Sequence, residues 1–343
     1  MSTIAVNAIT DANGGSTTSI NGTTPNAYNT VGKNLIINGA MQIAQRGTSS
    51  TSTGYATVDR FSSYANNTDE LAFSLEQSTD APDGFSNSFK WTTTTAETTI
   101  DSNEHVGFQQ KLEGQSLQQL AHGTTSAKKV TLSFWVKSSV TGTFAATLFK
   151  SNSSNIIGST YTINTANTWE KKTITFDGDT SGSIPNDNSR ELDIIWHLLA
   201  GSDFTSTDNT SWGTYSTGKW AYGHAQNGVI DTTNATWQIT GVQLEVGESA
   251  TEFEHRPYGT ELSLCQRYYQ KVGDSLNLFV TTQFNSTNHW VSTSFITSMR
   301  ASPTVTKTAS GTVNQENVST EVVTWQFTSA GTYVHSVKLD AEL

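Results

Sequence analysis

Residues 237–270 read WQITGVQLEVGESATEFEHRPYGTELSLCQRYYQ, and the rest of the chain is organised around this stretch. Its first part alternates with a period of two, which is typical of a strand with one buried and one solvent-exposed face. We expect one face to carry Ile239, Gly241, Gln243 and Glu245, and the other to carry Val242, Leu244 and Val246. A turn follows at 247–249, and Phe253–Pro257 would extend the strand until proline removes a hydrogen-bond donor.

The second part of this stretch predicts a short helix or turn. Gly259-Thr260 offers an N-cap, and the residues that follow lie near helical spacing: Leu262, Leu264, Cys265, Tyr268 and Tyr269. We therefore expect one β domain to close here and another to begin. The predicted organisation is an extended N-terminal arm (1–32), a jelly-roll β-sandwich (33–258) and a small C-terminal β domain (259–343).

The composition favours an all-β chain. Hydrophobic residues make up 34% of the sequence and charged residues only 14%, so Ser, Thr, Asn and Gln supply the difference. Threonine and aromatic residues favour strands, and the polar remainder suits an outer surface. Nine Trp and fifteen Phe can still build a sandwich core, because each ring buries a large area.

Charge and cysteine content exclude some classes of function and of stabilisation. The net charge is −11 and no basic patch is present, which argues against a nucleic-acid partner. The single cysteine, Cys265, cannot form an intrachain disulfide. No signal-peptide core or membrane-length apolar run is present, so we expect a soluble protein made in a cytoplasm and no membrane insertion.

Short strand patterns recur between residues 58 and 246, separated by turn signals. This spacing, without long helices, predicts a two-sheet sandwich or jelly roll, with one or two helical turns at 114–120. The expected strands are Val58–Tyr64, Leu71–Gln77, Ser88–Thr92, His105–Leu112, Lys129–Lys137, Phe144–Lys150, Thr160–Ile163, Trp169–Phe176, Leu192–Leu199 and Thr236–Val246.

The strand pattern restarts after residue 271. A unit of about 75 residues is near the lower limit of independent stability, so we expect it to pack on the sandwich or on copies of itself. Segment 301–319 is polar and reads as a loop. The expected strands are Leu276–Phe284, Trp290–Ile296, Val322–Phe327 and Tyr333–Leu339.

Residues 1–32 contain one short apolar alternation, Ile4, Val6 and Ile9, followed by a polar, turn-rich stretch. Such a segment cannot bury enough surface to fold alone. It is either a flexible leader or an arm that becomes ordered by adding a strand to a partner.

Several segments resemble known proteins. NLIINGAMQIAQRG (34–47) resembles the opening strand of carbohydrate-binding-module jelly rolls. Segments 132–144, 169–182, 239–270 and 299–306, together with the leader STIAVNAITDANGG, are similar to a module of tail-fibre and other virion proteins of tailed bacteriophages.

This resemblance implies a non-enzymatic virion protein made in the host cytoplasm. A tail fibre or receptor-binding protein that displays the jelly roll toward a host glycan is the first hypothesis. A head or tail scaffold or decoration protein without glycan binding is the second, and a glycan depolymerase is the third. The arm would dock on other virion proteins, through Ile4, Val6 and Ile9.

The sequence predicts neither a metal site nor a cofactor. The carbohydrate-binding modules hold a structural calcium with an acidic residue after the first Asn-Gly, but Met41-Gln42 stands there in this chain. Asp177–Gly182 matches half of a calcium loop, but Asn188 replaces the glutamate that such a loop requires, so a plain turn is the better interpretation.

The candidate sugar-binding segment is the aromatic, glycine-rich loop 211–224. Its rings could stack on sugars, or Trp212 and Trp220 could instead cap the sandwich or meet another subunit. The candidate carbohydrate-binding residues are Trp212, Tyr215, Trp220, Tyr222 and His224.

No catalytic motif is present. The acidic group could suggest a glycosidase pair, but a solvated strand edge explains it better: Glu245, Glu248, Glu252 and Glu254. Cys265 reads as a small core hydrophobe and not as a nucleophile.

A homo-oligomer is expected, because the C-terminal unit is small and nothing covalent stabilises it. The resemblance to fibre proteins sets the number at three. The candidate subunit contacts are Val322, Trp325, Phe327, Tyr333 and Val337.

Overall fold

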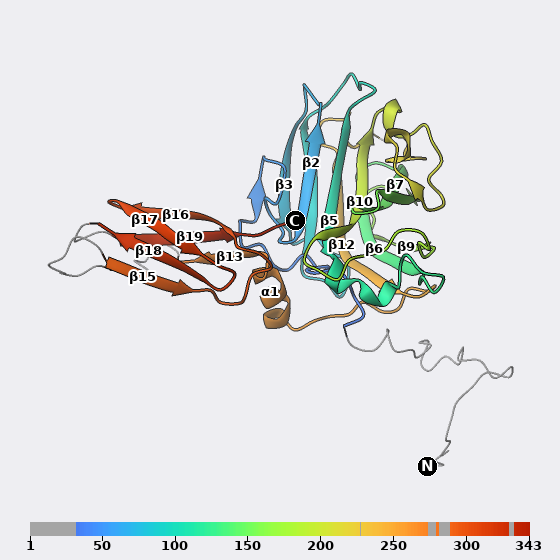
Figure 1. The fold of residues 1–343 in the computed structure, drawn as a ribbon. Coiled ribbons are helices and arrows are strands. Elements are labelled where there is room, and N and C mark those ends of the chain that lie inside the picture. The colour runs from blue at the N-terminus through green and yellow to red at the C-terminus, as the bar shows by residue number, and fades with distance from the viewer. Residues whose placement is uncertain (1–31, 227, 274–278, 281–288, 329–332) are drawn as a thin grey trace, which may run out of the picture.

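The computed structural model describes residues 32–226, 228–273, 279–280, 289–328 and 333–343, and it is built almost entirely of strands (Figure 1). Two six-stranded antiparallel sheets pack face to face, with the orders β1-β3-β4-β12-β6-β9 and β11-β8-β7-β10-β5-β2. The prediction of an all-β jelly-roll sandwich with an additional small β region is therefore confirmed. The N-terminal arm, with Ile4, Val6 and Ile9, lies outside the described residues.

Most strands of the sandwich lie within one or two residues of their expected positions. The short 3₁₀ turns η1 (Gly114–Ser116) and η2 (Gln118–Leu120) are present as expected, joined by η3 (Ser202–Phe204) and η4 (Thr217–Lys219). The strands are β1 (Ser49–Ser50), β2 (Phe61–Asn66), β3 (Ala72–Ser78), β4 (Ser88–Thr95), β5 (His105–Glu113), β6 (Val130–Ser138), β7 (Gly142–Lys150), β8 (Asn155–Ile163), β9 (Glu170–Phe176), β10 (Arg190–Ala200), β11 (Gly213–Thr214) and β12 (Thr236–Val246).

Aromatic rings fill the space between the two sheets. Phe108 stacks on Phe61 and on Phe89, with ring centroids 5.0 and 4.0 Å apart. Trp196 and Trp237 meet the same cluster at an angle, and both are fully buried. Alternation along each strand places these rings on the inner faces, so large side chains close the core in spite of the low apolar content.

Strand β12 differs from the simple alternation that was expected. A bulge shifts its register between Thr240 and Gln243, where Gly241 adopts a φ of 60°. Ile239 before the bulge and Leu244 after it therefore both point into the core, although they were assigned to opposite faces. The outer face is buried as well, because loops cover it, and Glu245 is only 1% exposed.

The expected opening strand at 34–42 is not a regular strand. This segment runs beside β12 and makes isolated backbone hydrogen bonds, such as Leu35 N–H to Leu244 O and Val242 N–H to Gly39 O. Asn38 and Met41 adopt positive φ angles, which interrupt an extended ladder. The expectation that Phe253–Pro257 extends β12 is also wrong, since 247–257 is a loop.

The predicted helix is present as α1 (Tyr258–Gln266). Its N-cap is Pro257 and not the expected Gly259-Thr260, because proline fixes the backbone angle that precedes the first turn. Cys265 is buried on this helix, and burial raises the pKa of its thiol well above the usual value. The interpretation of Cys265 as a core side chain agrees with this position.

Beyond α1, two further antiparallel sheets form a unit beside the sandwich (Figure 1). Segment 301–319, read from the sequence as a loop, instead carries two strands and the Gly311 turn between them. The first of these strands, 304–310, lies at a sheet edge and is rich in partly exposed threonine. It therefore lacks the alternating apolar residues by which a strand is recognised in a sequence. The strands are β13 (Tyr269–Val272), β14 (Phe279–Val280), β15 (His289–Ser294), β16 (Thr304–Ser310), β17 (Val313–Val318), β18 (Val322–Phe327) and β19 (Tyr333–Asp340).

The C-terminal unit has its own small core. Trp325 and Phe327 are fully buried in it and Val337 is 1% exposed, and the Trp325 indole N–H donates to Thr293 Oγ1. These three side chains were candidates for subunit contact, but their surfaces are already covered within one chain. Val322 is half-buried, and the side chain of Tyr333 lies outside the described residues.

A buried ionic joint links the C-terminal unit to the sandwich. The fully buried guanidinium of Arg60 pairs with Glu342 and lies 3.3 Å from the ring centroid of Tyr268. Arg46 pairs with Glu342 at 3.3 Å and lies 3.7 Å above the ring of Tyr269. The start and the end of the unit, at β13 and just past β19, therefore meet the sandwich at the same place.

Candidate functional site

A cleft of about 280 Å³ lies on the outer face of the sheet that contains β12. Strands β6, β9 and β12 form its floor, and the β3–β4 loop and the 247–257 loop form its walls. We call this feature the aromatic cleft. Its lining residues are Asp83, Gly84, Phe85, Ser133, Trp135, Lys171, Gly241, Glu252, Phe253 and His255.

Trp135 lies on the floor because alternation along β6 turns it outward, between the buried Phe134 and Val136. Lys171 is its register partner on β9, so a cation stands beside the indole. Both side chains retain exposed surface. An amphipathic ring beside an exposed charge can contact a ligand through both an apolar face and hydrogen bonds.

Three rings from the two loops form one wall. Phe85 packs edge-on against Phe253 with centroids 5.0 Å apart, and lies 5.3 Å from His255. Phe253 and His255 are 4.8 Å apart and nearly perpendicular. Because these rings hold one another, the two loops form a fixed wall.

The bulge in β12 makes room for this arrangement. A Cβ atom at Gly241 would lie 2.7 Å from Phe85 Cζ and 3.0 Å from Trp135 Cδ1. Gly241 also has a positive φ, which side chains rarely adopt. Only glycine at this position lets the wall and the floor approach so closely.

The β3–β4 loop is held by Asp80, next to the cleft. Its carboxylate accepts hydrogen bonds from Lys137, from Trp169 Nε1 at 3.2 Å and from Gln238 Nε2 at 3.2 Å. Partial burial alone would raise the pKa of Asp80, but these hydrogen bonds outweigh burial and lower it. Asp80 thus favours its charged form and ties the β3–β4 loop to β6 and β12.

Sequence reasoning missed the aromatic cleft, because its rings come from segments far apart in the chain. Trp135 was part of a strand pattern, Phe85 lay in an unassigned turn, and Gly241 was treated as an ordinary strand position. Of the acidic group, only Glu252 lines the cleft. Glu245, expected to be solvated, is instead buried and accepts hydrogen bonds from Thr251.

The predicted sugar-binding loop lies on the opposite sheet. Trp220 packs edge-on against Phe149 and His197, which point outward from β7 and β10. Trp212 donates from its indole to Asp177 O at 2.6 Å. The loop therefore covers the outer face of strands β7 and β10.

The remaining residues of this loop differ in exposure. His224 is 8% exposed, and burial lowers its pKa to about 4. Tyr215 is 37% exposed and Tyr222 is half-buried. A sugar contact at this loop stays a prediction, and Trp212, Tyr215, Trp220 and Tyr222 all retain some exposed surface for it.

The rejected calcium positions are filled in other ways. The Met41 side chain is fully buried in the core. Asp179, in the half-matching loop, pairs with the buried ammonium of Lys150 at 3.0 Å and accepts from Asn155 and Ser181. Burial alone would raise the pKa of Asp179, but these partners hold it well below its usual value.

No family model and no curated protein sequence matches this chain. Solved structures with a similar arrangement include the enzymatically active domain of bacteriophage CBA120 tailspike protein 4, at 13% identity and a TM-score of 0.34, over 63% of this chain and 22% of that one. The family 11 carbohydrate-binding module of a Clostridium thermocellum cellulosomal cellulase matches at 12% identity and a TM-score of 0.30, over 60% of this chain and 98% of that one.

A putative sugar-binding protein from Bacteroides thetaiotaomicron matches at 14% identity and a TM-score of 0.36, over 62% of this chain and all of that one. The chain thus spans about a fifth of the tailspike chain. The fold itself is a jelly-roll sandwich of two six-stranded antiparallel sheets.

Proposed function

We propose that this chain is a non-enzymatic glycan-binding component of a bacteriophage particle. The aromatic cleft carries this proposal. Pyranose rings present apolar C–H faces that pack on an indole such as Trp135, while their hydroxyls bond to groups such as Lys171 and Glu252. The volume of about 280 Å³ suits a short piece of a glycan.

Binding of host-envelope oligosaccharides on an array, followed by calorimetry, tests this function. Trp135→Ala should weaken binding by roughly 1–2 kcal/mol if the indole stacks on a sugar. Trp290→Ala is the matched control, because Trp290 is 60% exposed in the C-terminal unit, away from the cleft. Equal affinities of both variants and the native protein would show that the cleft is not the binding site.

The loop 211–224 provides a second arm of the same experiment. Trp220→Ala and Tyr222→Ala should each weaken binding by roughly 1–2 kcal/mol if the sugar binds there instead. A loss of thermal stability with unchanged binding per folded molecule would show that Trp220 and Tyr222 serve packing.

If no oligosaccharide binds at all, the alternative of a head or tail scaffold or decoration protein is favoured. Release of reducing sugar from envelope material would contradict the non-enzymatic part of the proposal.

The place on the particle rests on the resemblance of 239–270 and of the leader to tail-fibre proteins. We place the chain at an external position of the virion, most naturally the tail, with residues 1–32 as the docking arm. A chain without residues 1–32 should keep its sandwich but fail to enter particles. Normal incorporation would contradict the docking role.

A trimer remains part of this proposal. Since Trp325, Phe327 and Val337 are buried, the exposed Ile296 is the better candidate for contact. Light scattering from nanomolar to micromolar concentration measures the oligomeric state. A monomer throughout that range would mean that packing on the sandwich satisfies the C-terminal unit.

No helix among the described residues is long and apolar enough to cross a membrane.

A further inference from the structure

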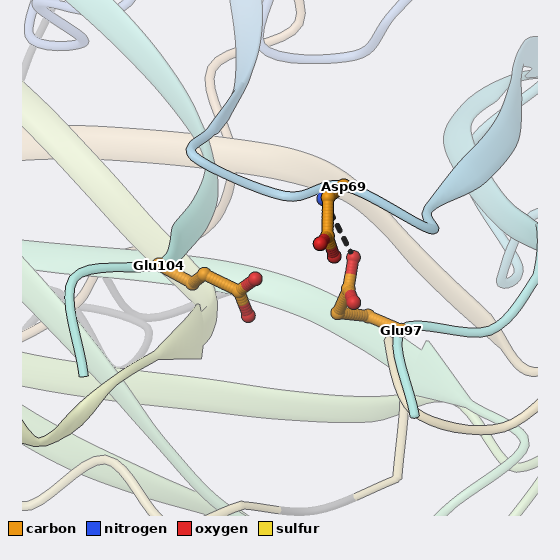
Figure 2. A group of neighbouring side chains, drawn as sticks. All are labelled: Asp69, Glu97 and Glu104. Atoms are coloured by element: carbon orange, nitrogen blue, oxygen red, sulfur yellow. Dashed lines mark hydrogen bonds between the residues drawn. The ribbon is translucent and has the colours of Figure 1, made fainter. Parts of the chain in front are cut away.

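Three carboxylates converge at one end of the sandwich (Figure 2). Asp69 belongs to the loop between β2 and β3, Glu97 lies just past the end of β4, and Glu104 immediately precedes β5. One oxygen from each carboxylate lies within 4.8 Å of the other two. Figure 2 shows the three groups pointing toward a common space from three separate segments of the chain.

Glu97 is fixed by hydrogen bonds to one of its carboxylate oxygens, whereas the other oxygen has no partner. Its Oε2 accepts backbone N–H groups from Asp69, Glu70 and Leu71, at 3.1–3.2 Å. Its Oε1 is buried and has no hydrogen-bond partner, and the whole residue is 0% exposed. A buried, unpartnered carboxylate oxygen is costly, and native structures rarely leave one without a partner such as a protein donor, a water or an ion.

Glu104 adds a second buried carboxylate, at 1% exposure. Burial and the neighbouring Glu97 raise its pKa, which is the expected response of a carboxylate beside another negative group. Throughout the described ranges, no lysine or arginine forms an ion pair with these two residues or with Asp69. The concentration of negative charge is therefore not compensated from within this part of the chain.

We propose that Asp69, Glu97 and Glu104 bind a calcium ion. The all-oxygen donor set suits a hard cation, and the exposed Asp69 opens the site to solvent, so that an ion and its remaining water ligands can enter. Glu97 and Glu104 form the buried floor. The ion would pair with the unpartnered Oε1 of Glu97 and connect the three segments that carry these carboxylates.

The donor set favours calcium over magnesium, because three carboxylates converge, whereas magnesium usually binds through one or two carboxylates and keeps several waters. Calcium–oxygen bonds of about 2.3–2.6 Å place opposite ligands up to roughly 5 Å apart, whereas magnesium–oxygen bonds of about 2.1 Å place them about 4.2 Å apart. One calcium ion can contact all three oxygens as they stand, within the 4.8 Å limit. Magnesium, with its strict octahedral geometry and its reluctant loss of water, suits such a flexible set of carboxylates less well.

This site differs from the calcium position considered in the sequence. Gln77, near the end of β3, donates to Met41 O at 2.7 Å, so Met41-Gln42 lies at that end of the strand. Asp69 precedes the start of β3. The two positions are therefore at opposite ends of the sandwich.

The test uses the full chain, freed of metal with EDTA and titrated with CaCl₂ in a calorimeter and in thermal unfolding. At a calcium concentration a hundred times Kd, the Tm should rise by roughly 5–10 °C. Glu97→Gln should weaken binding about tenfold or more, and so reduce the rise in Tm to about half or less. Without calcium this variant should be at least as stable as the native chain, because the amide removes a buried repulsion.

Glu70→Gln is the matched control, since Glu70 is the exposed neighbour of Asp69 and bonds to Thr98 outside the site. It should keep the full calcium response. If Glu97→Gln does not fold, Asp69→Asn at the exposed mouth gives the same test. Absence of heat and of a Tm shift in the native chain would overturn the proposal, and so would an undiminished response in Glu97→Gln or Asp69→Asn.

Discussion

The sandwich and the C-terminal unit are both β structures, but different interactions hold them. The sandwich closes around its own rings, and Phe61, Phe89 and Phe108 stack across the space between the two sheets. The C-terminal unit has a core around Trp325, but its connection to the sandwich is ionic. The comparison shows that the sandwich is stabilised by its own apolar packing. The C-terminal unit has an apolar core as well, but its position depends on charged residues that the sandwich supplies.

The joint explains why this dependence is specific. Arg60 is fully buried, so it needs both the Glu342 carboxylate and the Tyr268 ring in place. A buried cation without its partner is strongly unfavourable. The unit can therefore dock in one position only, at which Glu342 reaches Arg60.

The largest expected effect comes from opening the sandwich core. Trp196 is fully buried and meets Phe61, Phe108 and Phe134. Trp196→Ala should lower the free energy of unfolding by about 3–5 kcal/mol, because a large cavity remains. Urea unfolding followed by circular dichroism measures it.

Two further tryptophan variants serve as controls for that experiment. Trp290→Ala removes an exposed indole and should stay within about 0.5 kcal/mol of the native chain. Trp325→Ala should unfold the C-terminal unit and leave the sandwich transition in place. A single transition shifted equally by Trp325→Ala would show that the two regions unfold as one.

Breaking the joint should have the next largest effect. Glu342→Ala leaves the buried Arg60 without its ion-pair partner, and should lower the stability of the docked unit by about 3 kcal/mol. Reduced protection from hydrogen exchange in β13 and β19 would measure this loss. The exposed Glu321→Ala, in the same unit, should change little. Combining Glu342→Leu with Arg60→Met should recover most of the loss, and failure to recover would mean that the charges themselves are not what matters.

Acid should weaken the sandwich through a buried histidine. The pKa of His224 is lowered to about 4, and its Nδ1 accepts the Ala145 N–H at 3.4 Å, so the folded state keeps it neutral. The unfolded chain binds this proton near pH 6.5, so stability is lost as pH falls from there toward 4. Between pH 7 and pH 5 the native chain should lose about 2 kcal/mol more than His224→Gln. Parallel pH profiles of the two proteins would contradict this assignment.

The smallest expected effect concerns the second arginine of the joint. Arg46→Lys keeps the charge but loses the flat guanidinium above Tyr269, and should cost about 1 kcal/mol. A double-mutant cycle with Tyr269→Leu isolates the ring contact. A coupling energy of zero would leave only the ion pairs with Asp340 and Glu342 as the function of Arg46.

Local patterns predicted most of the sandwich because its strands alternate regularly. Strand β6 is an example, since Leu132, Phe134 and Val136 all point inward as expected. The prediction failed where one residue changes the phase, as Gly241 does in β12. It also failed in β16 and β17, whose partly exposed strands lack the apolar alternation.

The site could not be predicted to the same extent, since it depends on contacts between distant segments. Phe85 and Phe253 meet only after the sandwich has closed, and neither belongs to a recognisable motif. The carboxylates of Asp69, Glu97 and Glu104 likewise come together only through the turns between strands. The run QRYYQ at 266–270 lies within a segment that resembles virion proteins, but its role in the joint depends on Arg46 and Arg60, which come from a distant part of the chain.

The joint also has a mechanical consequence. Because the unit is attached through Tyr268–Tyr269 and Asp340–Glu342 at one end, its far end projects like a cantilever (Figure 1). A sideways force on β15 would act with a long lever arm on this attachment, where ion pairs and stacked rings resist bending. Under load, the attachment would therefore yield before the sandwich does, and the unit could detach while the sandwich stays folded.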